Sequence, residues 1–250
     1  MLRLLCVTAH PDDEAGGFGG SLLLYGARGV ETHVICLTPG QAATHRGSAR
    51  SEEELSAMRR REFQASCQVL KVARGEVLDY PDARLDRTDF YTVVSDLVQR
   101  IRRIRPHVML TIGPEGAVTA HPDHSMASLF ATLAYHWAGR ANRFPEQLKD
   151  GVTPHRTQKL YYATMLFTLP DRPPVAPSPV TACIEVGPER LAEKIRAFKQ
   201  HTTQAPLFPL FENAVRRRGT QELFHLAASI HPQHIRTESD LFEGVKEEAV

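Results

Sequence analysis

The chain has 250 residues, and its 30 lysine and arginine residues nearly balance its 29 aspartate and glutamate residues, giving a formal net charge of +1. This balance argues against a general nucleic-acid or anionic-membrane surface and favours a small polar substrate. The longest apolar stretch, Leu2 to Ala9, is too short to span a bilayer, and no signal-peptide pattern precedes it. We therefore expect one domain over residues 1–250, no nucleic-acid or membrane partner, and a cytoplasmic location.

Strand and helix patterns alternate in the first half of the chain. Apolar, β-branched runs predict strands over residues 2–8, 32–38, 76–78 and 107–112, and periodic patterns predict helices over 14–29, 51–72 and 90–104. Ser51 and Glu54 form a capping box at the start of the second helix. This alternation predicts an α/β fold with a Rossmann-like, mostly parallel sheet and helices on both faces.

The second half is less regular and predicts an elaborated C-terminal part. We expect a helix to about residue 137, a strand over 159–167, helices over 191–201 and 207–217, and an edge strand over 222–227. Residues 41–50 and the proline-rich residues 171–179 lack periodicity, so both are expected to be loops, the first near the site. The four cysteines lie far apart without a CxxC pair, which favours free thiols.

Two short polar runs each follow a predicted buried strand: His10-Pro11-Asp12-Asp13-Glu14 and His121-Pro122-Asp123-His124. In open α/β sheets, active sites form outside the carboxyl ends of the strands. A catalytic zinc site needs three nitrogen or oxygen ligands and one open position. We therefore expect His10, Asp13 and His124 to bind Zn²⁺, although Fe²⁺, Co²⁺ or Mn²⁺ also suits two imidazoles and one carboxylate.

The remaining polar residues of the two runs suggest catalytic roles. Asp12 is assigned to proton removal from the attacking water, and His121 to donation to the oxyanion or the leaving amine. Asp123 is expected behind the ligands, for instance orienting an imidazole. Alternatively, each run alone could be a proline turn that places acids at a helix N-terminus. The occurrence of two such runs at strand ends favours the metal site.

A glycine-rich run, Gly16-Gly17-Phe18-Gly19-Gly20, follows the first motif. Its spacing fits neither the dinucleotide fingerprint nor the Walker pattern. We interpret these glycines as small residues that let neighbouring elements approach closely.

These motifs resemble the LmbE-like or PIG-L family of zinc-dependent N-acetylglucosamine de-N-acetylases, which includes deacetylases of bacillithiol and mycothiol synthesis. The similarity extends to Gly113-Pro114-Glu115-Gly116, to Arg59 and Glu62, and to Lys194 and His201-Thr202-Thr203-Gln204. Some members place a tyrosine just before the second motif, where this chain has Val118-Thr119-Ala120.

The resemblance implies the same metal ligands, His10, Asp13 and His124, with Asp12 as general base and His121 assisting the tetrahedral intermediate. It also implies that Arg59 and Asp82 hold sugar hydroxyls.

The implied activity is removal of the N-acetyl group from a small acetylated amino sugar. N-acetylglucosaminyl malate is the lead candidate, and Arg46, Arg50 and Arg59 could supply the cationic pocket that malate needs. Two alternatives stay open: a metal-dependent amidase or esterase for another small substrate, and a non-catalytic sugar- or nucleotide-binding module. Association into a homo-oligomer is compatible with the sequence.

Overall fold

A single mixed sheet runs through the computed structural model, which describes residues 1–164, 175–231 and 236–248. Within these residues the strand order is β3-β2-β1-β4-β5-β7-β6. Neighbours from β3 to β5 pair in parallel, whereas β7 is antiparallel to both β5 and β6. The strands are β1 (Arg3–Thr8), β2 (Glu31–Cys36), β3 (Arg74–Val77), β4 (Val108–Ile112), β5 (Lys159–Ala163), β6 (Ala182–Glu185) and β7 (Gln221–Ser229). The predicted α/β fold with a mostly parallel sheet is confirmed.

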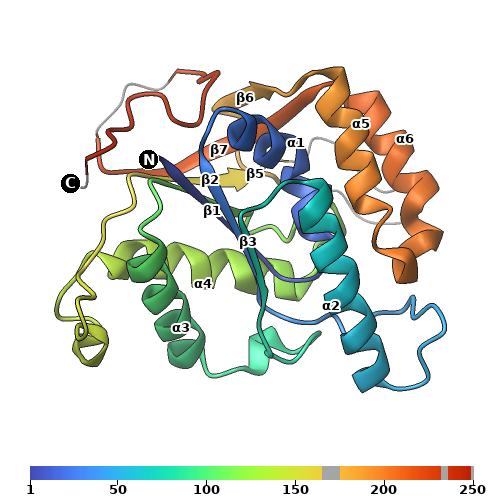
Figure 1. The fold of residues 1–250 in the computed structure, drawn as a ribbon, viewed down its shortest axis with the longest axis horizontal. Coiled ribbons are helices and arrows are strands. Elements are labelled where there is room, and N and C mark those ends of the chain that lie inside the picture. Colours follow the sequence, from blue (N-terminus) through green and yellow to red (C-terminus); the bar gives the residue numbers. More distant parts are fainter. Residues whose placement is uncertain (165–174, 232–235, 249–250) are drawn as a thin grey trace.

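Helices cover both faces of the sheet, as Figure 1 shows. The helices are α1 (Asp13–Ala27), α2 (Glu52–Val69), α3 (Phe90–Ile104), α4 (Pro122–Ala138), α5 (Gly187–Phe198) and α6 (Phe208–Arg218). Leu4 and Cys6 of β1 join a core with α1, α2 and α5, while Leu5 and Val7 join a second core with α3 and α4. Alternate residues of a strand point to opposite faces, so a continuous apolar run is what a strand buried on both sides requires.

The C-terminal strands differ from the sequence-based expectation. The prediction of an edge strand over 222–227 is wrong in its position, because β7 lies inside the sheet between β5 and β6. The edge is β6, a four-residue strand that the sequence analysis missed. Of the predicted strand over 159–167, residues 165–167 lie outside the described residues, as do residues 171–174 of the proline-rich segment.

The glycine-rich run of α1 lies where α5 and β7 approach the helix. A Cβ atom added to Gly20 would lie 2.9 Å from both Val186 Cγ2 and Glu222 Oε1, and one on Gly19 would lie 3.1 Å from Lys194 Cγ. A side chain at Gly20 would force its neighbours to shift, and one at Gly19 would be tightly packed against Lys194. The interpretation of these glycines as close-packing residues is confirmed for Gly19 and Gly20, whereas a Cβ atom on Gly16 would make an ordinary contact with Phe198, 3.7 Å away.

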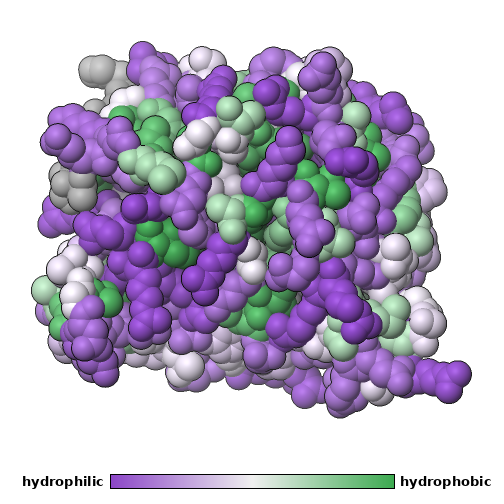
Figure 2. Space-filling view, viewed as in Figure 1, coloured by the Kyte–Doolittle hydropathy of each residue, from purple (hydrophilic) through white to green (hydrophobic). Residues whose placement is uncertain are grey.

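All four cysteines are free, and Cys6, Cys36 and Cys67 are buried, in agreement with the predicted thiols. On the face shown in Figure 2, hydrophilic residues dominate and hydrophobic ones form small, separate groups. Within the described part of the chain, every helix is too short or too polar to cross a membrane.

Candidate metal centre and active site

The two polar runs meet because the strands before them are neighbours. β1 pairs in parallel with β4, so their carboxyl ends lie side by side at one edge of the sheet. His10 follows β1 directly, and the second run forms the entry to α4, whose N-cap is His121. The sheet topology thus brings together residues that are more than one hundred positions apart in sequence.

His10, Asp13 and His124 form a compact group of possible metal ligands. His124 Nε2 lies 3.2 Å from His10 Nδ1 and 3.1 Å from Asp13 Oδ1, and Asp13 Oδ2 lies 3.8 Å from His10 Nδ1. Ligand atoms around a tetrahedral ion at about 2.0–2.1 Å are separated by about 3.3 Å. The three side chains therefore fit a divalent ion of this size.

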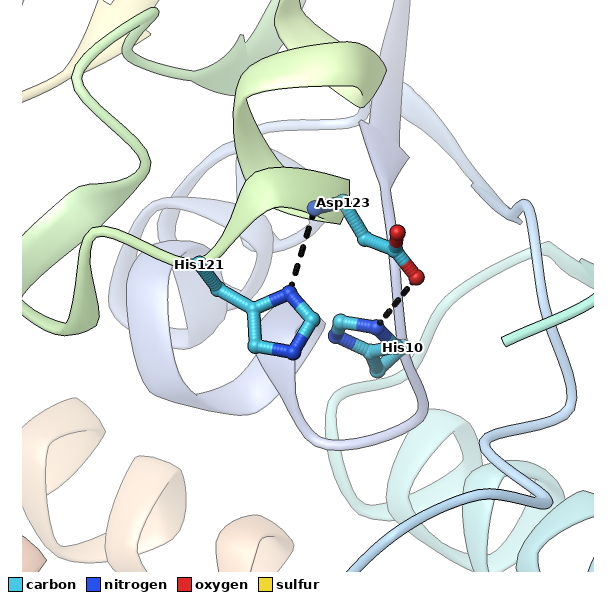
Figure 3. Close-up of side chains that lie close together, drawn as sticks. All are labelled: His10, His121 and Asp123. Atoms are coloured by element: carbon cyan, nitrogen blue, oxygen red, sulfur yellow. Dashed lines mark hydrogen bonds and ion pairs between the residues drawn. The ribbon is translucent and has the colours of Figure 1, made fainter. Parts of the chain in front are cut away.

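The ring of His10 is oriented by carboxylates behind it. Its Nε2 lies 3.0 Å from Asp82 Oδ1 and 3.3 Å from Asp123 Oδ2, and Figure 3 shows the second of these contacts. Nδ1 is left to face the other two proposed ligands, Asp13 and His124. His124 Nδ1 correspondingly lies 3.1 Å from the carbonyl oxygen of Gly116. Such partners fix which nitrogen of an imidazole is free for a metal.

The electrostatics of this cluster favour a bound cation. Burial alone would lower the pKa of His10, but hydrogen bonds to Asp123 and Asp82 outweigh it and raise that pKa to about 10. Burial opposes ionisation of Asp13, yet the neighbouring His124 and His10 hold the pKa of its carboxyl well below the usual value. Negative charge is thus concentrated around the imidazoles.

Asp12 adopts an unusual backbone conformation. Its φ is 116° and its ψ is −26°, in the left-handed region, although it is not a glycine. Strain of this kind costs on the order of 1–3 kcal/mol and persists only where the surroundings enforce it. The side chain makes no capping hydrogen bond to α1, which argues against the simple helix-cap interpretation of the first motif.

The carboxylate of Asp12 is half-buried beside a guanidinium. Arg59 Nη2 lies 3.0 Å from Asp12 Oδ2. Burial raises the pKa of Asp12 to about 6; Arg59 opposes this rise, and the charge of Asp13 adds to it. A carboxyl that titrates near neutrality is suited to accept a proton in the reaction.

His121 presents its far nitrogen to the site. Its Nδ1 accepts a hydrogen bond from the backbone N–H of Asp123 at 3.1 Å, as Figure 3 shows. Burial, together with the charges of His10 and His124, lowers the pKa of His121. The neutral ring then carries its proton on Nε2, so it can donate a hydrogen bond to a developing oxyanion.

His10, His121 and Asp123 form a second group of closely spaced donors. This group is less suited to a metal, because His121 Nδ1 already accepts a backbone hydrogen bond and His10 Nε2 is shared by two carboxylates. We therefore favour His10, Asp13 and His124 as ligands.

The two residues predicted to hold sugar hydroxyls are largely occupied by protein groups. Arg59 is 3% exposed and donates to Asp12, to the carbonyl of Pro11 and, at 3.1 Å, to the carbonyl of Gly40. Asp82 is 6% exposed, and its Oδ2 accepts from the backbone N–H of Ala42 at 2.8 Å while Oδ1 faces His10. Their geometry shows support of Asp12 and His10, and a substrate contact stays a prediction. Asp123 lies where a residue that orients an imidazole is expected, since it also accepts from the backbone of Ala83 and Leu85.

A buried hydrogen-bond network that includes the backbone of Asp12 was not predicted from the sequence. Glu14 is fully buried and contacts His201 and Ser66, and it accepts a hydrogen bond from the backbone of Asp12. The only available signals were the acidic residue closing the first motif and the His201-Thr202-Thr203-Gln204 run.

The comparison with protein families is decisive for the class. The family model PIG-L, described as GlcNAc-PI de-N-acetylase, matches residues 5–135, more than half of the chain. The chain belongs to the PIG-L family. Fold, site and family together define a deacetylase, a hydrolase that acts on an amide bond.

Two of the relatives are deacetylases of acetylated sugars. The chain is 27% identical, over 97% of both sequences, to 1D-myo-inositol 2-acetamido-2-deoxy-alpha-D-glucopyranoside deacetylase 2 of Catenulispora acidiphila. It is 30% identical to the diacetylchitobiose deacetylase of Thermococcus kodakarensis, over 82% of this chain and 70% of that one.

Solved structures show the same fold. The N,N'-diacetylchitobiose deacetylase of Pyrococcus horikoshii in complex with its inhibitor MPG superposes with a TM-score of 0.75 at 22% identity, covering 90% of this chain and 83% of that one. GalB, the 4-carboxy-2-hydroxymuconate hydratase of Pseudomonas putida, superposes with a TM-score of 0.72 at 19% identity, covering 94% and 99%. Since a hydratase shares this fold, the reaction has to be argued from the site.

Proposed function

We propose that this protein is a Zn²⁺-dependent hydrolase that removes the N-acetyl group from an N-acetylglucosaminide. The observation that carries the proposal is the meeting of three ligands, His10, Asp13 and His124, with His121, whose ring centroid lies 4.8 Å from that of His10. Asp12 adjoins the ligand Asp13 and offers a base with a pKa of about 6. Two imidazoles and a carboxylate suit zinc, and they also accept Fe²⁺, Co²⁺ or Mn²⁺.

The protein residues divide the remaining chemistry between them. When bound, the metal would supply Lewis acidity to the acetyl carbonyl and make water more acidic. Asp12 accepts the proton of the attacking water, and His121 Nε2–H donates to the carbonyl oxygen as negative charge develops. Asp12 or His121 then protonates the departing amine, so that acetate and a free amino sugar are formed. A neutral His121 suffices for the first donation, because its Nε2 carries a proton.

The group attached to the N-acetylglucosamine, the aglycone, could be neutral or could be malate. The relatives named above act on an inositol glycoside or on diacetylchitobiose, and their names do not mention malate. Arg59, one of three arginines considered for a malate pocket, is committed to Asp12 and to two backbone carbonyls. We therefore propose a neutral glycoside as the substrate and keep N-acetylglucosaminyl malate as a competitor.

The test measures primary-amine release by the Zn²⁺-loaded protein from four compounds: the N-acetylglucosaminyl glycosides of inositol and malate, diacetylchitobiose and free N-acetylglucosamine. We expect release from at least one neutral glycoside and a loss of about 10³-fold or more in the Asp12→Asn variant, since a positioned general base contributes about 10²–10⁴-fold. Absence of release from all four would reject the proposed substrate class. If the protein binds a sugar without turnover, and Asp12→Asn leaves that affinity unchanged, the non-catalytic module would be favoured instead.

A cytoplasmic location and assembly into a homo-oligomer stay predictions. Size-exclusion chromatography with light scattering tests the second. One domain over residues 1–250 is supported by the sheet, which contains strands from both halves of the chain.

A further inference from the structure

Side chains from two elements, α1 and α2, contact the segment of Asp12, whose backbone has the left-handed conformation. Arg59 of α2 donates to the carbonyl of Pro11 and to the carboxylate of Asp12. In addition, the backbone N–H of Asp12 donates to Glu14 Oε2 at 2.9 Å. Side chain and backbone of the proposed base are therefore held independently.

Glu14 is itself fixed from below. Its Oε1 accepts from Ser66 Oγ at 2.6 Å and lies 2.7 Å from His201 Nε2. The side chains of Glu14 and His201 are both 0% exposed. A buried carboxylate with three hydrogen-bonding partners has few alternative positions, so its second oxygen stays directed at the backbone of Asp12.

His201 is aimed at Glu14 by a turn that is tied to α2. Glu62 accepts from the hydroxyl of Thr202 at 2.6 Å, and from the backbone N–H and hydroxyl of Thr203, each at 2.7 Å. Arg59 and Glu62 are one helical turn apart on α2. Arg59 holds Asp12 directly, and Glu62 holds the turn that carries His201.

We propose that Glu14 and His201 are positioning residues that keep Asp12 in its left-handed conformation and so direct its carboxylate at the reacting water. This inference rests on the proposed function in taking Asp12 as the base. The two residues act through Asp12 and need no contact with the substrate.

The first test compares two substitutions of Glu14. Glu14→Met has a similar volume but cannot accept the N–H of Asp12, whereas Glu14→Gln keeps an acceptor oxygen. We expect Glu14→Met to lower kcat about 100-fold with KM changed less than about twofold, because misplacing a catalytic group by about 1 Å costs about that much. Glu14→Gln should recover most of the rate. His201→Leu should behave like Glu14→Met.

A matched control is another buried ion pair, whose lysine is the first residue of β5, at the end of the strand opposite to the carboxyl ends that carry the site. Lys159 Nζ lies 2.7 Å from Glu238 Oε1, with side chains 1% and 2% exposed. The double variant Lys159→Met/Glu238→Met removes charges of the same kind and should leave kcat unchanged. A similar loss of kcat in this control would mean that general destabilisation explains the Glu14 result.

A double-mutant cycle separates positioning of the base from support of the metal centre. In an Asp12→Asn background, Glu14→Met should have almost no further effect on the residual rate, since residues that act as one unit are not additive. The visible absorption spectrum of the Co²⁺-loaded Glu14→Met protein should match that of the wild type. An undiminished loss in the Asp12→Asn background, or an altered Co²⁺ spectrum, would overturn the inference.

Failure of the proposed function has a different signature. If the wild-type protein releases no amine from any of the four compounds, the proposed function fails, and crystal structures of the variants then decide the inference. Asp12 should leave the left-handed region in Glu14→Met and keep it in Glu14→Gln and in the Lys159/Glu238 control. A φ of Asp12 that stays near its wild-type value in Glu14→Met would contradict the proposed role.

Discussion

Asp82 and Asp123 both contact Nε2 of His10, whereas the proposed metal-binding atom of this ring is Nδ1. We expect Asp82→Asn to weaken metal affinity about 10–100-fold, because an amide cannot accept from His10 and Ala42 at once. A competition titration with a chromogenic chelator measures this. Asp79→Asn, whose side chain is 94% exposed, is the control and should match the wild type. A raised KM with unchanged metal affinity would instead assign Asp82 to the substrate.

A second prediction at the scale of single residues concerns His155, which is 5% exposed and lies 2.7 Å through Nε2 from the carbonyl of Pro106. Burial lowers its pKa from 6.5 to about 4, with Pro106 opposing the shift. Between these values the unfolded chain binds a proton that the folded protein does not, so stability falls as the pH is lowered through this window.

At pH 5 the expected loss is about 2 kcal/mol relative to pH 7.5. Urea unfolding at both pH values measures it, and the His155→Gln variant should lack this part of the pH dependence. Equal pH dependence in the two proteins would show that His155 does not contribute.

Within the first motif, some features could be predicted from the sequence and others could not. The grouping of His10, Asp13 and His124 could be predicted, because zinc chemistry restricts the choice of ligand types, and the fold does bring the three side chains together. Their binding of an ion stays a prediction. The left-handed backbone of Asp12 was not readable, since it depends on Arg59 and on His201, a residue 187 positions from Glu14. Nor was the contact between Asp82 and His10, which requires the folded sheet.

Among the elements, α1 offers a matched pair of glycines. A Cβ on Gly20 would meet Val186 and Glu222 at 2.9 Å, whereas one on Gly26 would meet nothing within 4 Å. Gly20→Ala should therefore destabilise the protein by about 1–3 kcal/mol through overpacking. Gly26→Ala should stabilise it by up to about 1 kcal/mol through helix propensity. Thermal unfolding of both variants is the measurement, and shifts of the same sign would contradict the close approach of α1 and β7.

Element prediction worked where one physical signal dominated. The apolar run before His10 and the capping box at Ser51 correspond to β1 and α2. β6 was missed because four residues, Ala182–Glu185, carry too short a pattern. β7 was placed at the edge because its half-polar sequence resembles an exposed strand, yet Glu222 is buried against Lys194 and the backbone of α1.

At the scale of the whole molecule, a bound metal should stabilise the fold, because its proposed ligands join the loop after β1 to the start of α4. Divalent metal at about 100 times its dissociation constant should raise the free energy of unfolding by about 2.7 kcal/mol. Thermal unfolding of the protein with Zn²⁺ and with a chelator measures the difference. His10→Ala should abolish most of it, and an equal response in His10→Ala would place the stabilising metal elsewhere.

The fold class followed from alternation of strand and helix, and the single mixed sheet follows the same rule as far as β5. The antiparallel direction of β7 could not be derived, because the two helices predicted before it do not determine the direction in which the chain returns to the sheet. Its partner β6 was too short to be recognised.

The sequence distance between the metal ligands and His201 has a consequence for biosynthesis. All three proposed ligands lie in the part of the chain that ends with α4, and the PIG-L match at residues 5–135 ends within the same part. His201 leaves the ribosome much later. The proposed ligands are therefore all synthesised before the partner of Glu14, so the order of synthesis allows the ion to be acquired before the base is aligned.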